Sequence, residues 1–170
     1  MRLSYSHFGT LTDTFTNVEK VWGAFKAGGA IPVGATTKLD FAAAAAGYQV
    51  IVGTAGTEHI CRGIYTGNGG TGAIPSSPFD GRAAVSGDVI ECLLFGVTEA
   101  LVNGSGGGAN SITAGETLQM AAAGKLIRGN NSGITGGPAA GAPIPGVRYA
   151  FGSMEASTAD ASNIVSVAVL

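Results

Sequence analysis

The chain has 170 residues, of which 45% are hydrophobic and only 12% charged, with a net charge of −2 at pH 7. This length fits one compact domain or two very small ones, and the high apolar content excludes a disordered chain. The lysines and arginines are scattered without a run or stripe, so we expect no nucleic-acid partner. No apolar stretch is long enough for a transmembrane helix, so we expect no membrane partner. Because the first residues lack the apolar core of a signal peptide, we expect synthesis in the cytoplasm.

Residues 1–20 differ from the rest of the chain because they are rich in Ser, Thr and aromatic residues. Their large side chains keep no sustained period of two or 3.6. They are Leu3, Tyr5, Phe8, Leu11, Phe15 and Val18. We interpret the segment as an extended N-terminal arm with apolar anchors, and a first edge strand packed on its own domain is the alternative. Residues 21–170 are then a single β domain.

Short apolar runs follow the arm, separated by turns rich in Gly. They predict strands at 21–26, 36–41, 49–52 and 59–65, with 53–56 as the turn between the last two. Residues 42–46 are all alanine, but five residues cannot hold a helix unaided, so a single helical turn or a loop is expected there. Residues 66–78 carry several glycines and two prolines and predict a long loop.

The second half of the chain contains the strongest strand pattern, over residues 85–102, and Gly96 is expected to break or bulge it. Further strands are predicted within 112–128, at 149–155 and at 163–170, with Gly-rich connections at 103–110 and 130–145. Because no amphipathic helical pattern occurs, we predict an all-β fold, a small barrel or sandwich with Gly-rich loops and at most one or two short helical turns.

Two stretches of the sequence resemble each other. Residues 31–36 and 112–117 both read Ile-x-x-Gly-x-Thr, and each is followed by an alanine run, a glycine and an apolar strand. One β unit is therefore built twice, with no cluster of reactive side chains in either copy. This pattern favours a protein that presents a surface for assembly, and so low a charge content is typical of a surface covered by partners.

Residue types that could carry chemistry are few and dispersed. His7 lies in the arm, and His59 lies in a predicted strand beside Glu58, where neighbouring side chains point to opposite faces and do not pair. Cys61 and Cys92 lie in apolar strand contexts and are expected to be buried, reduced thiols. Two Cys and two His spread this widely are too few for a zinc site. We predict no catalytic, cofactor-binding or metal-binding residue.

Two glycine-rich loops, 67–72 and 104–108, look like pieces of nucleotide-binding motifs. A phosphate-binding loop leads into a helix N-terminus and, in its P-loop form, contains a Lys followed by Ser or Thr. Neither loop has these features, so we expect their glycines to serve turns.

Several motifs follow one another between residues 28 and 170. In chain order they are GGAIPVG (28–34), GDVIEC (87–92), GVTEA (96–100), ITAGETLQ (112–119), AAAGK (121–125) and FGSMEA (151–156), before a Val-rich terminal strand. This order resembles the capsid decoration (cement) proteins of tailed bacteriophages. The chain departs from the family pattern in its long loops at 66–80 and 130–146, and in having ADASN (159–163) where the family has a Gly-Asp before the last strand.

The resemblance implies a small β-barrel that binds the outside of an icosahedral phage head and bridges neighbouring major capsid subunits against the pressure of the packaged DNA. It implies a virion protein, assembled in the host cytoplasm, that is a homotrimer or a dimer and uses no cofactor. The apolar anchors of the arm (Leu3, Tyr5, Phe8, Leu11 and Phe15) would contact the capsid, because an arm can add a strand to a neighbouring sheet edge.

Three other readings of the sequence stay open. The β composition also suits another phage structural module, such as a head fibre base, a tail protein or a baseplate protein. A small β-fold hydrolase would depend on Glu58 or His59, or on carboxylates that only the fold brings together. A carbohydrate-binding sandwich would need exposed aromatic residues, for which Trp22 and four tyrosines are available.

Overall fold

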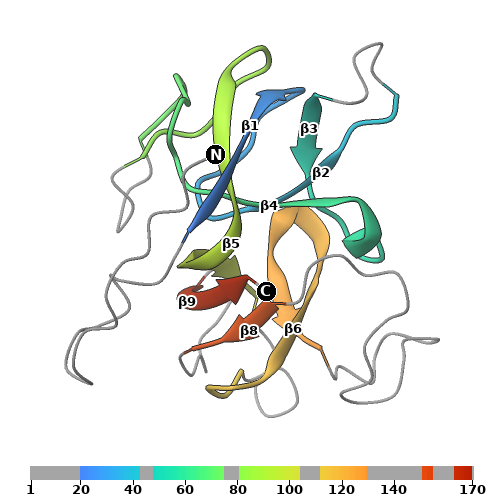
Figure 1. The fold of residues 1–170 in the computed structure, drawn as a ribbon, viewed down its shortest axis with the longest axis vertical. Helices are drawn as coiled ribbons and strands as arrows, with labels where there is room; N and C mark the ends of the chain where they lie inside the picture. The colour runs from blue at the N-terminus through green and yellow to red at the C-terminus, as the bar shows by residue number, and fades with distance from the viewer. Residues whose placement is uncertain are drawn as a thin grey trace.

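The computed structural model describes residues 20–42, 48–74, 81–103, 112–129, 151–154 and 163–169. Residues 1–19, including all five anchors of the predicted arm, lie outside the described residues, as do most of the alanine run and the loop at 130–146. Within the described ranges the chain is all-β, as the sequence predicts (Figure 1).

The described elements are strands, most of them short, and two single helical turns. The strands are β1 (Val21–Ala27), β2 (Thr36–Leu39), β3 (Gln49–Val52), β4 (Cys61–Tyr65), β5 (Val89–Val102), β6 (Thr117–Met120), β7 (Leu126–Arg128), β8 (Phe151–Ser153) and β9 (Asn163–Val169). The two 3-10 turns are η1 (Glu58–Ile60) and η3 (Ala122–Gly124). The predicted fold class is therefore confirmed, including its one or two short helical turns.

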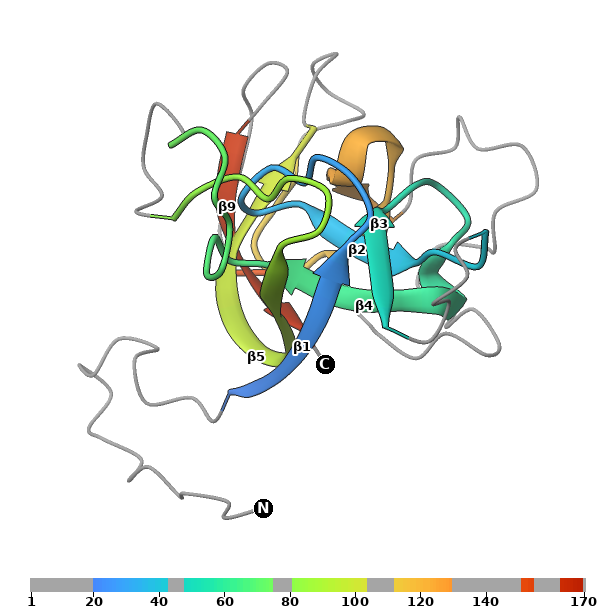
Figure 2. The same ribbon diagram turned by 90° about the horizontal axis from the view of Figure 1, so that it is seen from above.

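Five strands close into a barrel in the first half of the chain. They pair in the order β1-β3-β2-β4-β5, and β5 pairs back onto β1 to complete the ring. The β1–β3 pairing is parallel, whereas the other four are antiparallel. Figure 2 shows β1 and β5 side by side, with β4 passing behind them.

The second half of the chain repeats this arrangement. The pairings β5-β7-β6-β8-β9 form a second ring of the same order, closed by β5 against β9, and again only one of its pairings, β5 with β7, is parallel. The two rings occupy the upper and lower halves of Figure 1. The β unit that the sequence repeats is thus a whole barrel, and the long strand β5 belongs to both copies.

Gly96 lies where β5 changes partners. Residues up to Phe95 pair with β1, and residues from Gly96 onward pair with β9. Gly96 has a φ of 119°, a conformation that residues with a side chain rarely adopt. The strand does not break there, but its register with β1 shifts just before Gly96, between the pairs Trp22–Leu93 and Val21–Phe95. Gly96 is thus the point at which one strand passes from the first ring to the second.

The tight turn of the repeated motif also occurs outside its two copies. Among the described residues it spans 32–35, 54–57, 85–88 and 113–116, and in each the fourth residue donates its N–H to the first residue's carbonyl at 3.2 Å. The third position is Gly34, Gly56, Gly87 or Gly115, with φ between 75° and 98°, as a type II turn requires. The sequence comparison does not find the turn at 85–88, because its flanking residues are Ala and Val in place of Ile and Thr.

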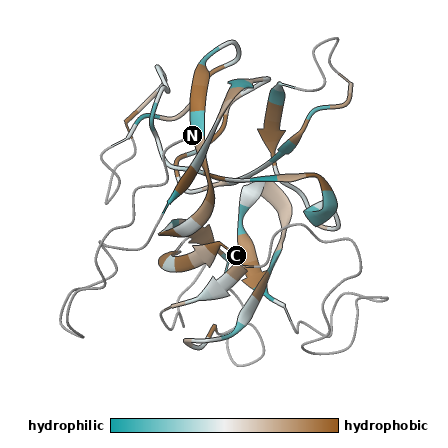
Figure 3. Cartoon of the chain, viewed as in Figure 1, coloured by the Kyte–Doolittle hydropathy of each residue, from teal (hydrophilic) through white to brown (hydrophobic). Residues whose placement is uncertain are grey.

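Each ring encloses a core. The first core comprises Ala27, Ile31, Val33, Ala35, Leu39, Val50, Tyr65, Ala84, Ile90 and Cys92. The second comprises Cys61, Ile64, Leu93, Ala100, Val102, Ile112, Leu118, Met120, Leu126, Phe151, Val165, Val167 and Val169. Apolar residues are prominent along β3, β5 and β9 (Figure 3).

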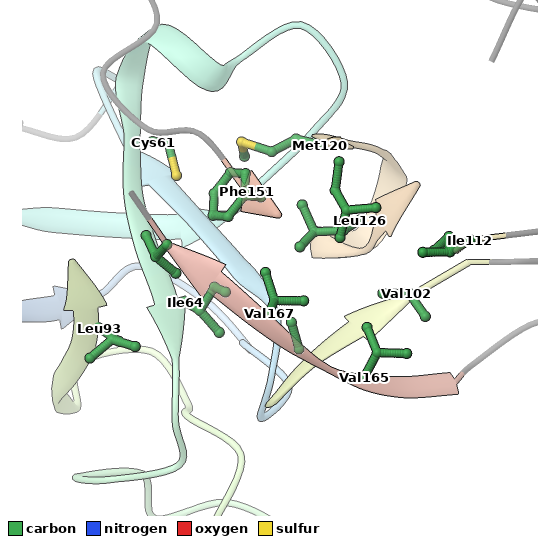
Figure 4. Close-up of a cluster of buried hydrophobic side chains, with 13 residues drawn as sticks. Cys61, Ile64, Leu93, Val102, Ile112, Met120, Leu126, Phe151, Val165 and Val167 are labelled. Atoms are coloured by element: carbon green, nitrogen blue, oxygen red, sulfur yellow. The ribbon is translucent and has the colours of Figure 1, made fainter. Parts of the chain in front are cut away.

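The second core extends into the first ring. Cys61 and Ile64 come from β4 and Leu93 comes from the first half of β5, yet all three belong to the second cluster of buried side chains (Figure 4). Neighbouring β5 residues serve different cores, because successive side chains of a strand point to opposite faces: Cys92 faces the first and Leu93 the second. The two barrels therefore share buried side chains as well as a strand.

One predicted connection is wrong. Residues 53–56 were expected to join two paired strands, but β3 pairs with β1 and β2, and β4 pairs with β2 and β5. The chain must therefore pass around β2 between β3 and β4, and it does so through residues 53–60. For the same reason β4 begins at Cys61 and not at His59, because Glu58–Ile60 form the turn η1.

Candidate interaction surface

Strand β1 alternates between covered and exposed residues. Trp22, Ala24 and Lys26 are exposed, whereas Val21, Gly23 and Phe25 are partly covered. This is the period of two that a strand shows when one face lies on a core and the other faces out. Trp22 is therefore on the outer face, where 43% of its surface is exposed.

One edge of β1 is open over most of its length. β1 pairs with β5 from Val21 to Lys26, but with β3 only at Lys26 and Ala27. In the described part of the chain no strand lies along the other edge from Val21 to Phe25. Rows of unpaired backbone groups on such an edge can accept an added strand.

The hydrogen bonds at the end of β1 show which groups face the open edge. Ala27 donates its N–H to Asp88 in the turn before β5, and Lys26 donates in the opposite direction, to Tyr48 just before β3, both at 2.8 Å. Backbone groups alternate between the two edges of a strand. The N–H and C=O groups of Ala24 and Trp22 therefore point to the open edge, as those of Lys26 do.

A second exposed aromatic residue lies near the start of β1, on the side where β1 pairs with β5. Phe95 of β5 is the register partner of Val21, and it is 41% exposed, nearly as much as Trp22. Two large apolar side chains thus face out where residues 1–19 join the barrel. Exposed apolar side chains that gather in one place typically mark an interaction site.

Two more exposed aromatics flank the connection between β2 and β3. Phe41 is 63% exposed and Tyr48 is 75% exposed. In the second ring the corresponding connection is the turn η3, which packs on the first ring. Gly124 donates its N–H to Gly53 O at 3.0 Å and accepts from Thr36 Oγ1 at 3.1 Å. The connection thus contacts the other ring in the second repeat, whereas in the first repeat it is flanked by two exposed aromatic side chains.

Two carboxylates stabilise turns. Asp88 accepts the N–H of Val85 at 2.8 Å, and Glu116 accepts the N–H of Thr113 at 2.8 Å, each from the first residue of its own turn. The equivalent first residue in the turn at 32–35 is Pro32, which has no N–H, and the equivalent fourth residue is Ala35. The acid at the fourth position is therefore present only in turns whose first residue has a backbone N–H that needs an acceptor.

The pKa values of both carboxyl groups are lowered. The N–H groups of Val85 and Thr71 hold the pKa of Asp88 below its ordinary value. Partial burial raises the pKa of Glu116, but hydrogen bonds from Thr113 and the Arg128 guanidinium, 2.7 Å away, outweigh it and leave that pKa lowered. Both acids are ionised at neutral pH and already engaged, which suits a structural role and not a general acid.

The candidate residues for enzymatic chemistry are placed unfavourably for it. Cys61 and Cys92 are buried free thiols, as predicted, and burial raises the pKa of each to about 12, so neither is a ready nucleophile. Glu58 is buried and accepts the N–H of Met120 at 3.0 Å, which ties η1 to β6. His59, the next residue, is exposed.

The described ranges contain no group of three or more His, Cys, Asp or Glu residues that could hold a metal ion. No helix in the described part of the chain is both long and apolar enough to cross a membrane. The glycines of the loop at 67–72 serve close backbone packing: Gly67 and Gly69 have φ near 90°, and a Cβ at Gly67 would lie 2.5 Å from Gly81 Cα.

The sequence matches no known protein-family profile and no curated protein. The likeness to capsid decoration proteins therefore rests on the pattern of turns and strands.

Sequence reasoning expected a capsid contact in the arm and did not find the unpaired edge of β1 with its exposed Trp22. A large apolar residue such as Trp22 is ordinarily assigned to the core, and the run VWGAFK does not say which of its faces is covered. The signal that could have found it is Lys26, since residues at even spacing from an exposed lysine in a strand share its face.

Proposed function

We propose that this protein is a virion structural protein that binds the outer surface of an icosahedral phage head and cements neighbouring major capsid subunits. The observation that carries the proposal is the double barrel with exposed aromatics at its edges. Asp88, Glu116 and Glu58 hold turns and strands together, both cysteines are buried, and several large apolar side chains of the described residues are exposed where a partner could reach them. The resemblance to decoration proteins supplies the class of partner.

Low charge and repeated barrels suit a lattice. Each contact with a capsid subunit can be weak, because many copies bound across one shell reinforce each other. We place the protein on the capsid exterior as a homo-oligomer, a trimer or a dimer, with the arm reaching the neighbouring subunit through Leu3, Tyr5 and Phe8. Its role is to hold the shell together against internal DNA pressure.

The test is a binding experiment with purified protein and expanded heads that lack decoration. We expect saturable co-sedimentation and a rise in the temperature at which the heads release DNA. Phe41→Ser together with Tyr48→Ser is expected to weaken binding. Ile74→Ser, which removes an equally exposed apolar residue from a different loop, is the control. Heads that bind no protein, and that release DNA at the same temperature with and without it, would refute the proposal.

The alternative of a tail or baseplate module shares the β architecture. Tail components form rings of six, whereas head decoration proteins form trimers or dimers, so light scattering of the purified protein separates the two.

A further inference from the structure

The open edge of β1 offers hydrogen-bonding groups that no described strand uses. Trp22 and Ala24 each direct one N–H and one C=O there, since their neighbours Gly23 and Phe25 face β5. Exposed edges are usually protected by charge or proline. The open part of this edge, from Val21 to Phe25, carries neither, because Lys26 already pairs with β3, and the exposed Trp22 lies near its start.

The segment before β1 contains a strand pattern of its own. Although the large side chains of the whole arm keep no period, residues 10–16 read TLTDTFT, with Thr at every second position and Leu11, Asp13 and Phe15 between. β-branched residues in strict alternation are typical of a strand. Asp13 is the only charge in 10–18, whereas 20–27 contains two lysines and no acid, so the two segments have opposite charges.

The residues between these segments do not favour a reversal of the chain. Residues 17–20 are Asn-Val-Glu-Lys. Only Asn17 among them readily tolerates positive φ, and Val18 follows it in place of the Gly that a two-residue hairpin turn favours. We therefore expect the chain to continue in an extended form from residue 10 into β1. An extended segment cannot lie along the edge of the strand that it continues, but it can lie along the same edge of another copy.

We propose that residues 12–16 of each copy pair with the open β1 edge of a second copy, so that two copies exchange their arms. With a two-fold axis at the 17–20 segment, residues 12–25 of the two copies form one antiparallel ribbon that ends where β3 begins to pair with β1, and the contact is closed, as isologous interfaces are. An axis between Val18 and Glu19 sets Phe15 opposite Trp22 and Asp13 opposite Ala24, diagonal to Lys26. Aromatic and opposite-charge pairs of this kind stabilise adjacent strands.

The exchange is a property of the free protein and does not depend on capsid binding. Leu3, Tyr5 and Phe8 precede the paired segment and stay available to a capsid subunit. A failed head-binding test would leave the exchange standing, and a failed exchange would leave head binding untouched.

The experiment blocks the edge and the arm separately in the full-length chain. Ala24→Pro removes the open-edge N–H while leaving the groups that face β5, which is where a strand tolerates proline; Ala24→Ser keeps the N–H and is the matched control. Phe15→Asp, which removes the side chain expected opposite Trp22, disables the arm. By light scattering we expect the wild type and Ala24→Ser to be oligomers, and each blocked variant to be a monomer.

Mixing the two blocked variants tests whether the arm of one copy binds the β1 edge of the other. The proline variant has an intact arm and the arm variant has an intact edge, so an equimolar mixture is expected to form a 1:1 complex that neither forms alone. Monomeric wild type, an oligomeric proline variant, or a mixture that stays monomeric would each overturn the proposal. If the proline variant loses its cooperative thermal transition, Trp22→Asp replaces it in the same mixture, with the same expected outcomes.

Discussion

At the scale of single residues, several glycines are required by contact and not only by turns. Gly63 in β4 has a φ of 78°, and a Cβ there would lie 1.9 Å from the carbonyl oxygen of Leu93. That oxygen belongs to the strand shared by both barrels, so it cannot move without disturbing the two rings. Gly115 has a similar φ of 85° but open space around it, and Gly29 has open space and no positive φ.

Alanine substitutions at these three glycines separate the cost of a positive φ from the cost of a steric clash of the new Cβ atom. We expect Gly63→Ala to lower the free energy of unfolding by about 4 kcal/mol or more, in the range of the most damaging single changes. Gly115→Ala should cost about 1–2 kcal/mol from the left-handed backbone alone. Gly29→Ala should be neutral or stabilise by up to about 1 kcal/mol. Urea unfolding measures all three, and equal effects at Gly63 and Gly115 would contradict the predicted collision.

At the scale of elements, Asp88 joins a turn to a loop. Its carboxylate accepts the N–H of Val85 within the turn, and the N–H and hydroxyl of Thr71 from the preceding loop. Because the folded state lowers its pKa, the unfolded state, with an Asp pKa of about 3.9, binds the proton more readily. The stabilisation is therefore complete well above that value and is lost as the pH falls through the folded pKa.

Calorimetry between pH 7 and pH 2.5 tests this role. We expect the Tm of the wild type to fall more steeply below about pH 4 than the Tm of Asp88→Asn, because asparagine can accept hydrogen bonds but does not titrate. Glu99→Gln removes an exposed carboxylate from β5 and controls for the loss of charge. An Asp88→Asn profile parallel to that of the wild type over the whole range would show that these hydrogen bonds do not couple folding to pH.

Local patterns predicted most strands, but not how they pair. Alternation and β-branched residues placed β1 and β9 to within one residue, because those signals depend on near neighbours. The end of β5 was also correct, but its predicted start at residue 85 was four residues early, since 85–88 form a turn. The order β1-β3-β2-β4-β5 depends on which faces meet in three dimensions, so the sequence suggested a hairpin at 53–56 that does not form. The open edge of β1 was likewise hidden, because an unpaired edge is defined by a strand's neighbours and not by its own residues.

At the scale of the whole molecule, the two barrels are joined by more than a shared strand. Leu101 donates its N–H to Gly34 O at 2.8 Å, and Met120 donates to the carboxylate of Glu58 at 3.0 Å. Each bond runs from the second ring to the first. With β4 side chains also buried in the second core, neither barrel can unfold without exposing groups that the other covers.

We therefore expect one cooperative unfolding transition, and Leu93 is the residue to test it. Leu93 is fully buried, lies in the first half of β5 and packs in the second core. Leu93→Ala should lower the free energy of unfolding by about 2–5 kcal/mol. The loss should appear equally in the fluorescence of Trp22, which reports on the first ring, and in hydrogen exchange of β9, which reports on the second. Leu94→Ala, at the half-covered neighbour, should cost less. Two separate transitions, or a Leu93→Ala loss confined to one ring, would show that the barrels fold independently despite sharing β5.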